Sequence, residues 1–69
     1  MLYFVVDKDG SEWVYDDPPI KDEKNGIWIA RNDDINFIKL PLGSTKKICG
    51  WETSWNGGFI TKENEMGFY

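Results

Sequence analysis

Short apolar and aromatic runs separated by polar turn residues characterise the start of the chain. Residues 2–6 and 11–16 are rich in Val, Tyr, Trp and Phe, and the segment between them, residues 7–10, ends in Asp-Gly. Asp-Gly is a typical hairpin signal because glycine adopts the positive φ that such turns need. In the second run Trp13 and Tyr15 alternate with other residues, so both rings are expected to face the core. This pattern predicts a β-hairpin.

The middle of the chain predicts a second hairpin after a proline break. The Pro-Pro pair at residues 18–19 removes two backbone donors and ends the preceding strand. Residues 20–25 are mostly polar or charged and are expected to form an exposed loop. Residues 27–31 and 35–40 have strand character and flank the polar turn at residues 32–34, so we expect them to pair with each other.

A short helix and a last pair of strands follow. Residues 44–49 form the candidate helix, with Ser44 as N-cap and Gly50 as the glycine that ends it. Residues 51–55 and 59–62 flank an Asn-Gly-Gly turn and are expected to be strands.

The predicted fold class is mainly β, at the margin of α+β. We expect a single domain spanning residues 1–69, built as a small bent antiparallel sheet or partly open barrel of about five to six short strands, with one short helix near residues 44–49. Residues 63–69 are expected to be a flexible tail. Alternatively, this segment docks on the domain or on another copy of the chain.

Composition narrows the function classes. The chain has 69 residues, a formal net charge of −4, no His, one Cys and four Trp. The chain lacks His, the commonest general base, and a Ser or Cys nucleophile would need a positioned base. The adjacent acidic pairs are typical of solvated turns, so catalysis is not expected. We expect no enzyme activity, no metal and no cofactor. The net negative charge disfavours nucleic acid, whose affinity comes from Lys and Arg.

The compartment is expected to be the cytoplasm. Residues 1–7 lack the basic region and the longer apolar run of a signal peptide. No apolar stretch approaches the roughly 20 residues that span a bilayer, so no membrane association is expected. The unpaired Cys49 agrees with a reducing environment and is interpreted as a buried, inert thiol. Small domains without disulfides or metals often self-associate, so a homodimer is preferred over a monomer.

One short motif offers an anion site. A glycine, two hydroxyl residues and two lysines stand together at the predicted helix start: Gly43, Ser44, Thr45, Lys46 and Lys47. Backbone N–H groups and lysines in such a place could hold a phosphate. The P-loop spacing is not met, because the required upstream glycine is missing. An ordinary N-cap with exposed lysines explains the same residues, so a nucleotide or other small-molecule ligand is an alternative.

The tryptophans point to protein binding. Trp13 and Trp28 would suffice for a core of this size. Trp51 and Trp55 would share one face if residues 51–55 were a strand, and that face is either core or a binding surface. The candidate protein-binding residues combine these two rings with a nearby Tyr and acidic loop residues: Trp51, Trp55, Tyr15, Asp16, Asp17, Asp22 and Glu23.

Two segments carry a resemblance. Asp7–Trp13, and Leu40–Gly50 with the Trp-containing segment after it, resemble a group of very short uncharacterised proteins encoded by bacteriophages and prophages, whereas residues 17–39 have no counterpart. The resemblance implies a bacterial host and brings no catalytic residues. In that setting small domains often bind and inhibit host proteins, including antiphage defence proteins. The leading hypothesis is therefore a host-protein binder, with nucleotide sequestration and virion assembly as alternatives.

Overall fold

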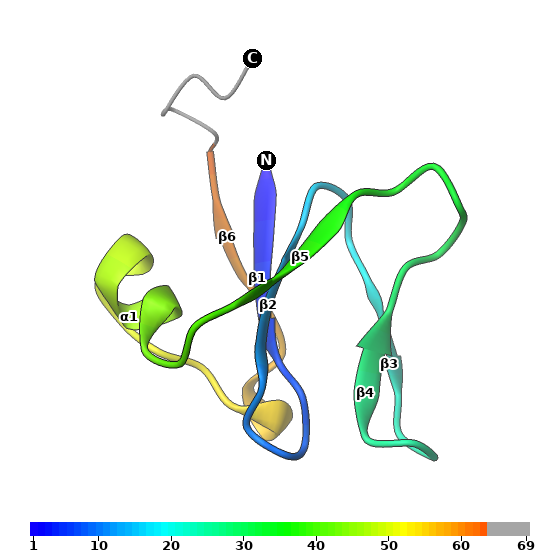
Figure 1. The fold of residues 1–69 in the computed structure, drawn as a ribbon, viewed down its shortest axis with the longest axis horizontal. Coiled ribbons are helices and arrows are strands. Elements are labelled where there is room, and N and C mark those ends of the chain that lie inside the picture. The colour runs from blue at the N-terminus through cyan, green and yellow to red at the C-terminus, as the bar shows by residue number, and fades with distance from the viewer. Residues whose placement is uncertain (64–69) are drawn as a thin grey trace.

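The structure is a computed structural model that describes residues 1–63. Within these residues five short strands are followed by one α-helix, one turn of 3-10 helix and a last strand (Figure 1). In chain order they are β1 (Leu2–Val6), β2 (Glu12–Tyr15), β3 (Ile20–Asp22), β4 (Ile27–Ile29), β5 (Phe37–Leu40), α1 (Ser44–Cys49), η1 (Trp55–Gly57) and β6 (Ile60–Lys62). The predicted tail falls almost entirely outside the described residues.

The first hairpin is confirmed. Strands β1 and β2 are antiparallel, with Val5 opposite Trp13 and Tyr3 opposite Tyr15. Gly10 has a φ of 94°, the left-handed conformation that the Asp-Gly pair predicted. Its N–H donates to the carbonyl of Asp7 at 2.9 Å, which closes the turn.

The predicted second hairpin is wrong. Strand β4 pairs with β3, which lies within the segment expected to be a loop, and Gly26 closes their turn by donating its N–H to the carbonyl of Asp22. Strand β5 instead pairs with β2, so that Phe37 lies opposite Tyr15 and Ile38 opposite Val14. The prolines at residues 18–19 end β2 but do not prevent a new strand directly after them.

The predicted last pair of strands is also wrong. Residues 51–54 form no strand, and the turn of η1 stands where the Asn-Gly-Gly hairpin loop was expected. The remaining strand, β6, pairs with β1 at the other side of the sheet, with Phe4 opposite Ile60. The first and last strands of the described chain are therefore neighbours.

The helix prediction is confirmed, with its cap shifted by one residue. Helix α1 covers Ser44–Cys49, and Gly50 ends it with a φ of 85°. Gly43, not Ser44, is the N-cap, and the Ser44 hydroxyl donates to the carbonyl of Pro41 at 2.5 Å. A helix this short has little stability of its own, so contacts with the sheet must hold it in place.

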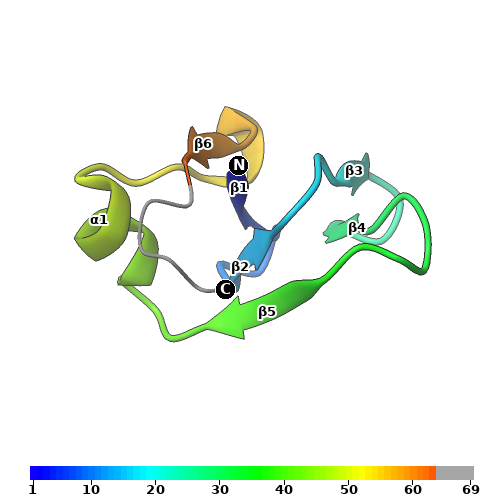
Figure 2. The ribbon, with the colours of Figure 1, turned by 90° about the horizontal axis from the view of Figure 1, so that it is seen from above.

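The main sheet lies between α1 on one face and the β3–β4 hairpin on the other (Figures 1 and 2). Its strand order is β5-β2-β1-β6, and β3 and β4 form a separate two-stranded sheet. The fold-class prediction is confirmed: residues 1–63 are mainly β, with six strands in antiparallel sheets and one short helix. Over these residues the main sheet is not closed into a barrel.

Trp28 anchors the hairpin to the sheet. Its ring is buried in a cluster with Val5 and Tyr15, and Trp13 packs against this cluster at partial burial. The Tyr15 hydroxyl donates to the carbonyl of Trp28 at 2.9 Å, and the Trp28 indole donates to the carbonyl of Val6 at 3.1 Å. Both expected core tryptophans thus contribute to the core, Trp28 more fully.

Candidate protein-binding site

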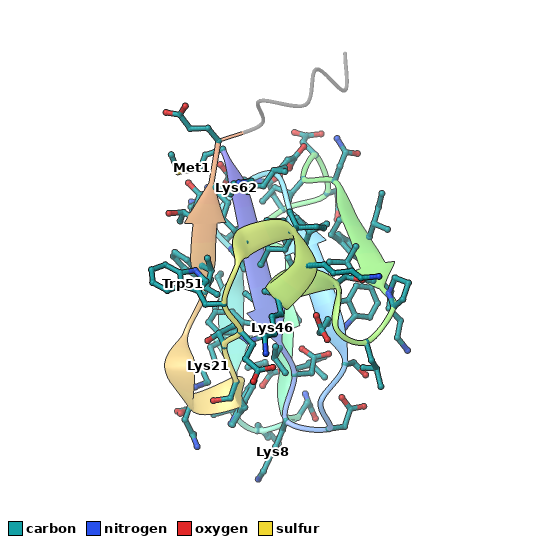
Figure 3. The ribbon with its side chains drawn as sticks, turned by 90° about the vertical axis from the view of Figure 1, so that its left-hand side faces the viewer. Met1, Lys8, Lys21, Lys46, Trp51 and Lys62 are labelled. Carbon is teal, nitrogen blue, oxygen red and sulfur yellow. The ribbon has the colours of Figure 1, made fainter. Side chains whose placement is uncertain are left out.

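Trp51 lies on the surface just after α1. Its side chain is 66% exposed and points away from the sheet (Figure 3). The segment that carries it has no regular structure, because Gly50 ends the helix in the left-handed conformation and turns the chain. Ile48, at the end of α1, is 45% exposed. The fold thus leaves a large aromatic ring and, three residues earlier in the chain, an aliphatic side chain exposed.

Trp55 does not share a face with Trp51. It begins η1 and packs against Trp28, with ring centroids 6.2 Å apart in an edge arrangement. Lys21 lies above the Trp55 ring, with Nζ 4.3 Å from its centroid, and donates a 2.6 Å hydrogen bond to the Trp55 carbonyl. A lysine over an indole face is stabilised by the negative charge of the ring face. Trp55 therefore completes the core and does not extend the exposed aromatic surface.

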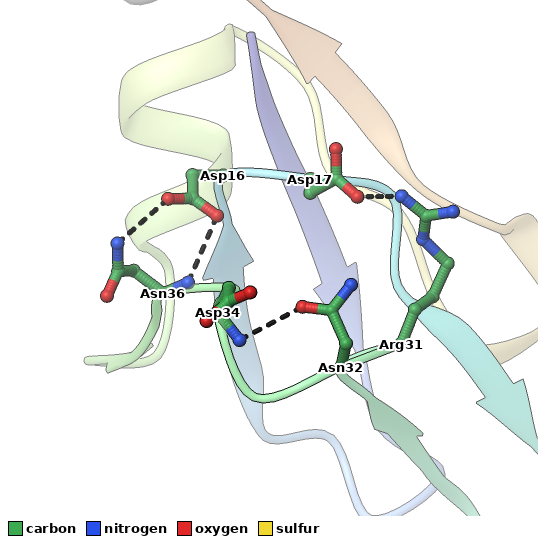
Figure 4. Close-up of polar contacts among 6 residues, drawn as sticks. All are labelled: Asp16, Asp17, Arg31, Asn32, Asp34 and Asn36. Atoms are coloured by element: carbon green, nitrogen blue, oxygen red, sulfur yellow. Dashed lines mark hydrogen bonds and ion pairs between the residues drawn. The ribbon is translucent and has the colours of Figure 1, made fainter.

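Asp16 and Asp17 join two loops. Asp16 accepts hydrogen bonds from the backbone N–H and the side-chain amide of Asn36, at 3.1 and 3.0 Å (Figure 4). Asp17 forms an ion pair with Arg31. These carboxylates connect the segment after β2 with the segment before β5. Their charge stays near the surface, but each already has a partner within the chain.

The other predicted acidic residues lie at the turn of the β3–β4 hairpin. Asp22 ends β3 and accepts a 2.8 Å hydrogen bond from the side-chain amide of Asn25, while Glu23 is exposed in the turn. Asp22 and Glu23 thus lie at the far end of β3 from Asp16 and Asp17, and the four predicted acidic residues do not form one cluster. Tyr15 is 3% exposed, and a partner protein cannot reach its ring. Burial, and then the nearby Asp7 charge, raise the pKa of its hydroxyl, which remains a donor.

The predicted anion site is filled by a carboxylate of the chain itself. Glu12 on β2 accepts hydrogen bonds from the N–H groups of Gly43 and Thr45, at 2.5 and 2.8 Å. These are the N–H groups that a phosphate would have used, so the contacts weigh against the nucleotide alternative. Lys46 and Lys47 are exposed on the helix.

Glu12 makes α1 sensitive to acid. Partial burial acts to raise the pKa of Glu12, but the N–H groups of Thr45 and Gly43 outweigh it and hold the pKa below its usual value of 4.5. A lowered pKa in the folded state means that the carboxylate stabilises the fold at neutral pH, and that this contribution is lost as the pH falls below about 4.5.

Replacing Glu12 by Gln is expected to lower the free energy of unfolding by about 1 kcal/mol at pH 7, because the amide accepts more weakly and at one atom. The deficit should shrink as the pH falls below 4.5 and through the lowered pKa of Glu12, where the wild-type carboxylate itself becomes protonated. Urea unfolding at several pH values measures both effects. Glu23→Gln is the matched control. An equal deficit at pH 7 and pH 3 would contradict the role given to the charge.

Cys49 is half-buried, less fully than the sequence predicted. Burial raises the pKa of its thiol, which favours the protonated form. Within residues 1–63, no group of three His, Cys, Asp or Glu side chains is arranged to hold a metal ion.

The sequence interpretation missed the exposed edge of the sheet. Strand β5 lies at one edge, and its Ile38 side chain is 65% exposed. Pro41 directly follows this strand, and proline is typical of edge strands because it cannot donate to a neighbour. Pro41 was therefore the feature of the sequence from which an edge strand could have been predicted.

Among the residues that the structure describes, no helix has the length and apolar character needed to cross a membrane. Comparison with models of known families finds no match for the chain. No curated protein and no solved structure matches it significantly either.

Proposed function

We propose that the protein is a non-enzymatic, phage-type binding domain that attaches to a protein of its bacterial host and thereby inhibits it. The observation that carries this proposal is the exposure of Trp51 in a chain whose other tryptophans support the core. Tryptophan is prominent among the residues that dominate binding energy at protein interfaces. The host setting rests on the resemblance of the two segments described above.

The partner's chemistry follows from the surface. An indole that is 66% exposed fits an apolar pocket, and the exposed Ile48 adds an aliphatic contact at the end of α1. The formal charge of −4 favours a partner of opposite net charge, because opposite charges accelerate encounter. We therefore expect a host protein with an apolar pocket and a net positive charge.

Replacing Trp51 by Ala is expected to abolish capture of a stoichiometric partner from bacterial lysate. For a purified partner, the loss of a central tryptophan is expected to be about 2 kcal/mol, or roughly 30-fold in Kd. Isothermal titration calorimetry measures this change. Ile20→Ala is the matched control, because Ile20 is 47% exposed on β3, away from Trp51.

Two results would overturn the proposal. One is the absence of any stoichiometric partner for the wild-type protein in lysates of candidate hosts. The other is a captured partner whose Kd is unchanged in Trp51→Ala. The thermal unfolding midpoint of Trp51→Ala should stay close to that of the wild type, which separates loss of binding from loss of folding.

A further inference from the structure

Strand β5 presents a free edge with a mostly apolar sequence. It is the outer strand of the main sheet, and within residues 1–63 no other element lies beyond it (Figure 2). Phe37 and Ile38 are 49% and 65% exposed, and Leu42 just after the strand is 79% exposed. Exposed apolar edges readily accept another strand, and Lys39 is the only charged residue of β5. Because a charge and a proline limit such pairing, the register must place Lys39 and Pro41 where they do not interfere.

The pairing of β5 with β2 decides which of its backbone groups face outward. The N–H of Asp16 donates to the carbonyl of Asn36, so the backbone of Asn36 faces inward to β2. Because the inward-facing residues alternate along an antiparallel ladder, Ile38 and Leu40 also direct their N–H and C=O groups toward β2. Phe37 and Lys39 therefore direct theirs away from the sheet, where a further strand would bind them.

We propose that this edge binds a second copy of the chain, so that two β5 strands pair antiparallel about a two-fold axis through Ile38. In this register Phe37 of one copy lies opposite Lys39 of the other, and both residues have outward-facing backbone groups. Each such pair exchanges N–H···O=C bonds in both directions. The two main sheets become one continuous sheet. The neighbouring register, centred on Lys39, is poorer because Phe37 would then face Pro41, which has no N–H.

Side chains and charges favour a second copy over an unrelated strand. Ile38 meets Ile38 on the α1 side of the sheet, and Lys39 meets the ring of Phe37 on the other side, so no like charges lie directly opposite. Strand β5 begins after the acidic pair Asp33 and Asp34 and ends shortly before the lysines of α1. Antiparallel pairing places the acidic end of each copy beside the basic end of the other. The edge is thus complementary to itself.

A charge swap at the two-fold axis tests the proposal. We expect the wild-type chain to be a dimer at millimolar concentration in sedimentation equilibrium. Ile38→Lys alone and Ile38→Glu alone should each weaken the dimer at least tenfold, because each places like charges opposite one another. An equimolar mixture of the two variants should recover a dimer. Ile20→Lys, an equivalent change at an exposed position on β3, should leave the dimer intact.

A wild-type chain that stays monomeric at millimolar concentration overturns the proposal. So do Ile38 variants that dimerise like the wild type, or a mixture that stays monomeric although both variants are folded by circular dichroism. Lys39→Pro gives a second check, since it removes an outward N–H without taking a hydrogen bond from β2 and should also yield a monomer. These outcomes are independent of host binding, because the Trp51 variants test that interaction at a different surface.

Discussion

Replacing Trp28 by Ala is expected to unfold most of the protein at 25 °C. The substitution removes the largest side chain of the core cluster, which is 8% exposed, and with it the hydrogen bond from the indole to the carbonyl of Val6. Tryptophan-to-alanine changes in a core cost about 3–5 kcal/mol. A single core in a domain of this size rarely supplies more than about 3–5 kcal/mol in total. The loss therefore matches the whole stability of the fold.

Urea unfolding followed by circular dichroism measures this effect. Trp51→Ala is the matched control, since it removes the same side chain from an exposed position and is expected to change stability by less than about 0.5 kcal/mol. Trp28→Phe should lie between the two, because it keeps an aromatic ring but loses the indole donor. Equal losses for Trp28→Ala and Trp51→Ala would contradict the burial described for these two residues.

Replacing Asp7 by Ala is expected to destabilise the protein by about 2–3 kcal/mol. Asp7 is 6% exposed, and its Oδ1 accepts a 2.9 Å hydrogen bond from the backbone N–H of Trp28. Hydrogen bonds to charged groups contribute about 1.5–3 kcal/mol, and the substitution leaves a buried N–H without a partner. This bond and the one from Lys8 N–H to the carbonyl of Gly26 join the first hairpin to the second.

The control for Asp7 separates charge from hydrogen bonding. Asp7→Asn keeps an acceptor oxygen in place and should recover more than half of the stability lost in Asp7→Ala. Asp33→Ala removes a carboxylate from an exposed loop and should have an effect within about 0.5 kcal/mol. If Asp7→Ala were as stable as Asp33→Ala, the contact between Asp7 and Trp28 would not hold the two hairpins together.

Local signals in the sequence were sufficient for the elements that form between neighbouring residues. The Asp-Gly turn before Ser11 and the glycine after Cys49 determine φ within a few residues, and both predictions are confirmed. The strand at Ile20 was missed because it is three residues long and follows two prolines. Two of its residues are polar, so no apolar run marked it.

Strand partners that are distant in the sequence could not be predicted from local pattern. The segment before Pro41 was correctly given strand character, but its pairing with β2 joins residues separated by more than twenty positions. Trp28 is buried in a cluster with Val5 and Tyr15, and contacts of this kind between distant segments leave no mark in the local pattern. The same limit applied to β6, whose partner is the first strand of the described chain.

The residues of the candidate binding site were predicted only in part, because their exposure also depends on contacts between segments that are distant in the sequence. Trp51 and Trp55 were treated alike because a strand would have given them one face, whereas the turn after Gly50 and the start of η1 separate them. Tyr15 was grouped with the binding residues although the alternation along its strand predicted a core position, and the core position is the one confirmed. Which aromatic residue is left exposed depends on packing between distant segments.

The central claim is that the fold buries Trp28 and leaves Trp51 available to a partner. NMR of the indole N–H groups in the presence of a soluble paramagnetic agent tests this directly on the full chain. The Trp51 signal is expected to broaden most and the Trp28 signal much less, since the Trp28 indole is bonded to the carbonyl of Val6. A Trp51 signal as strongly protected as that of Trp28 would contradict the account.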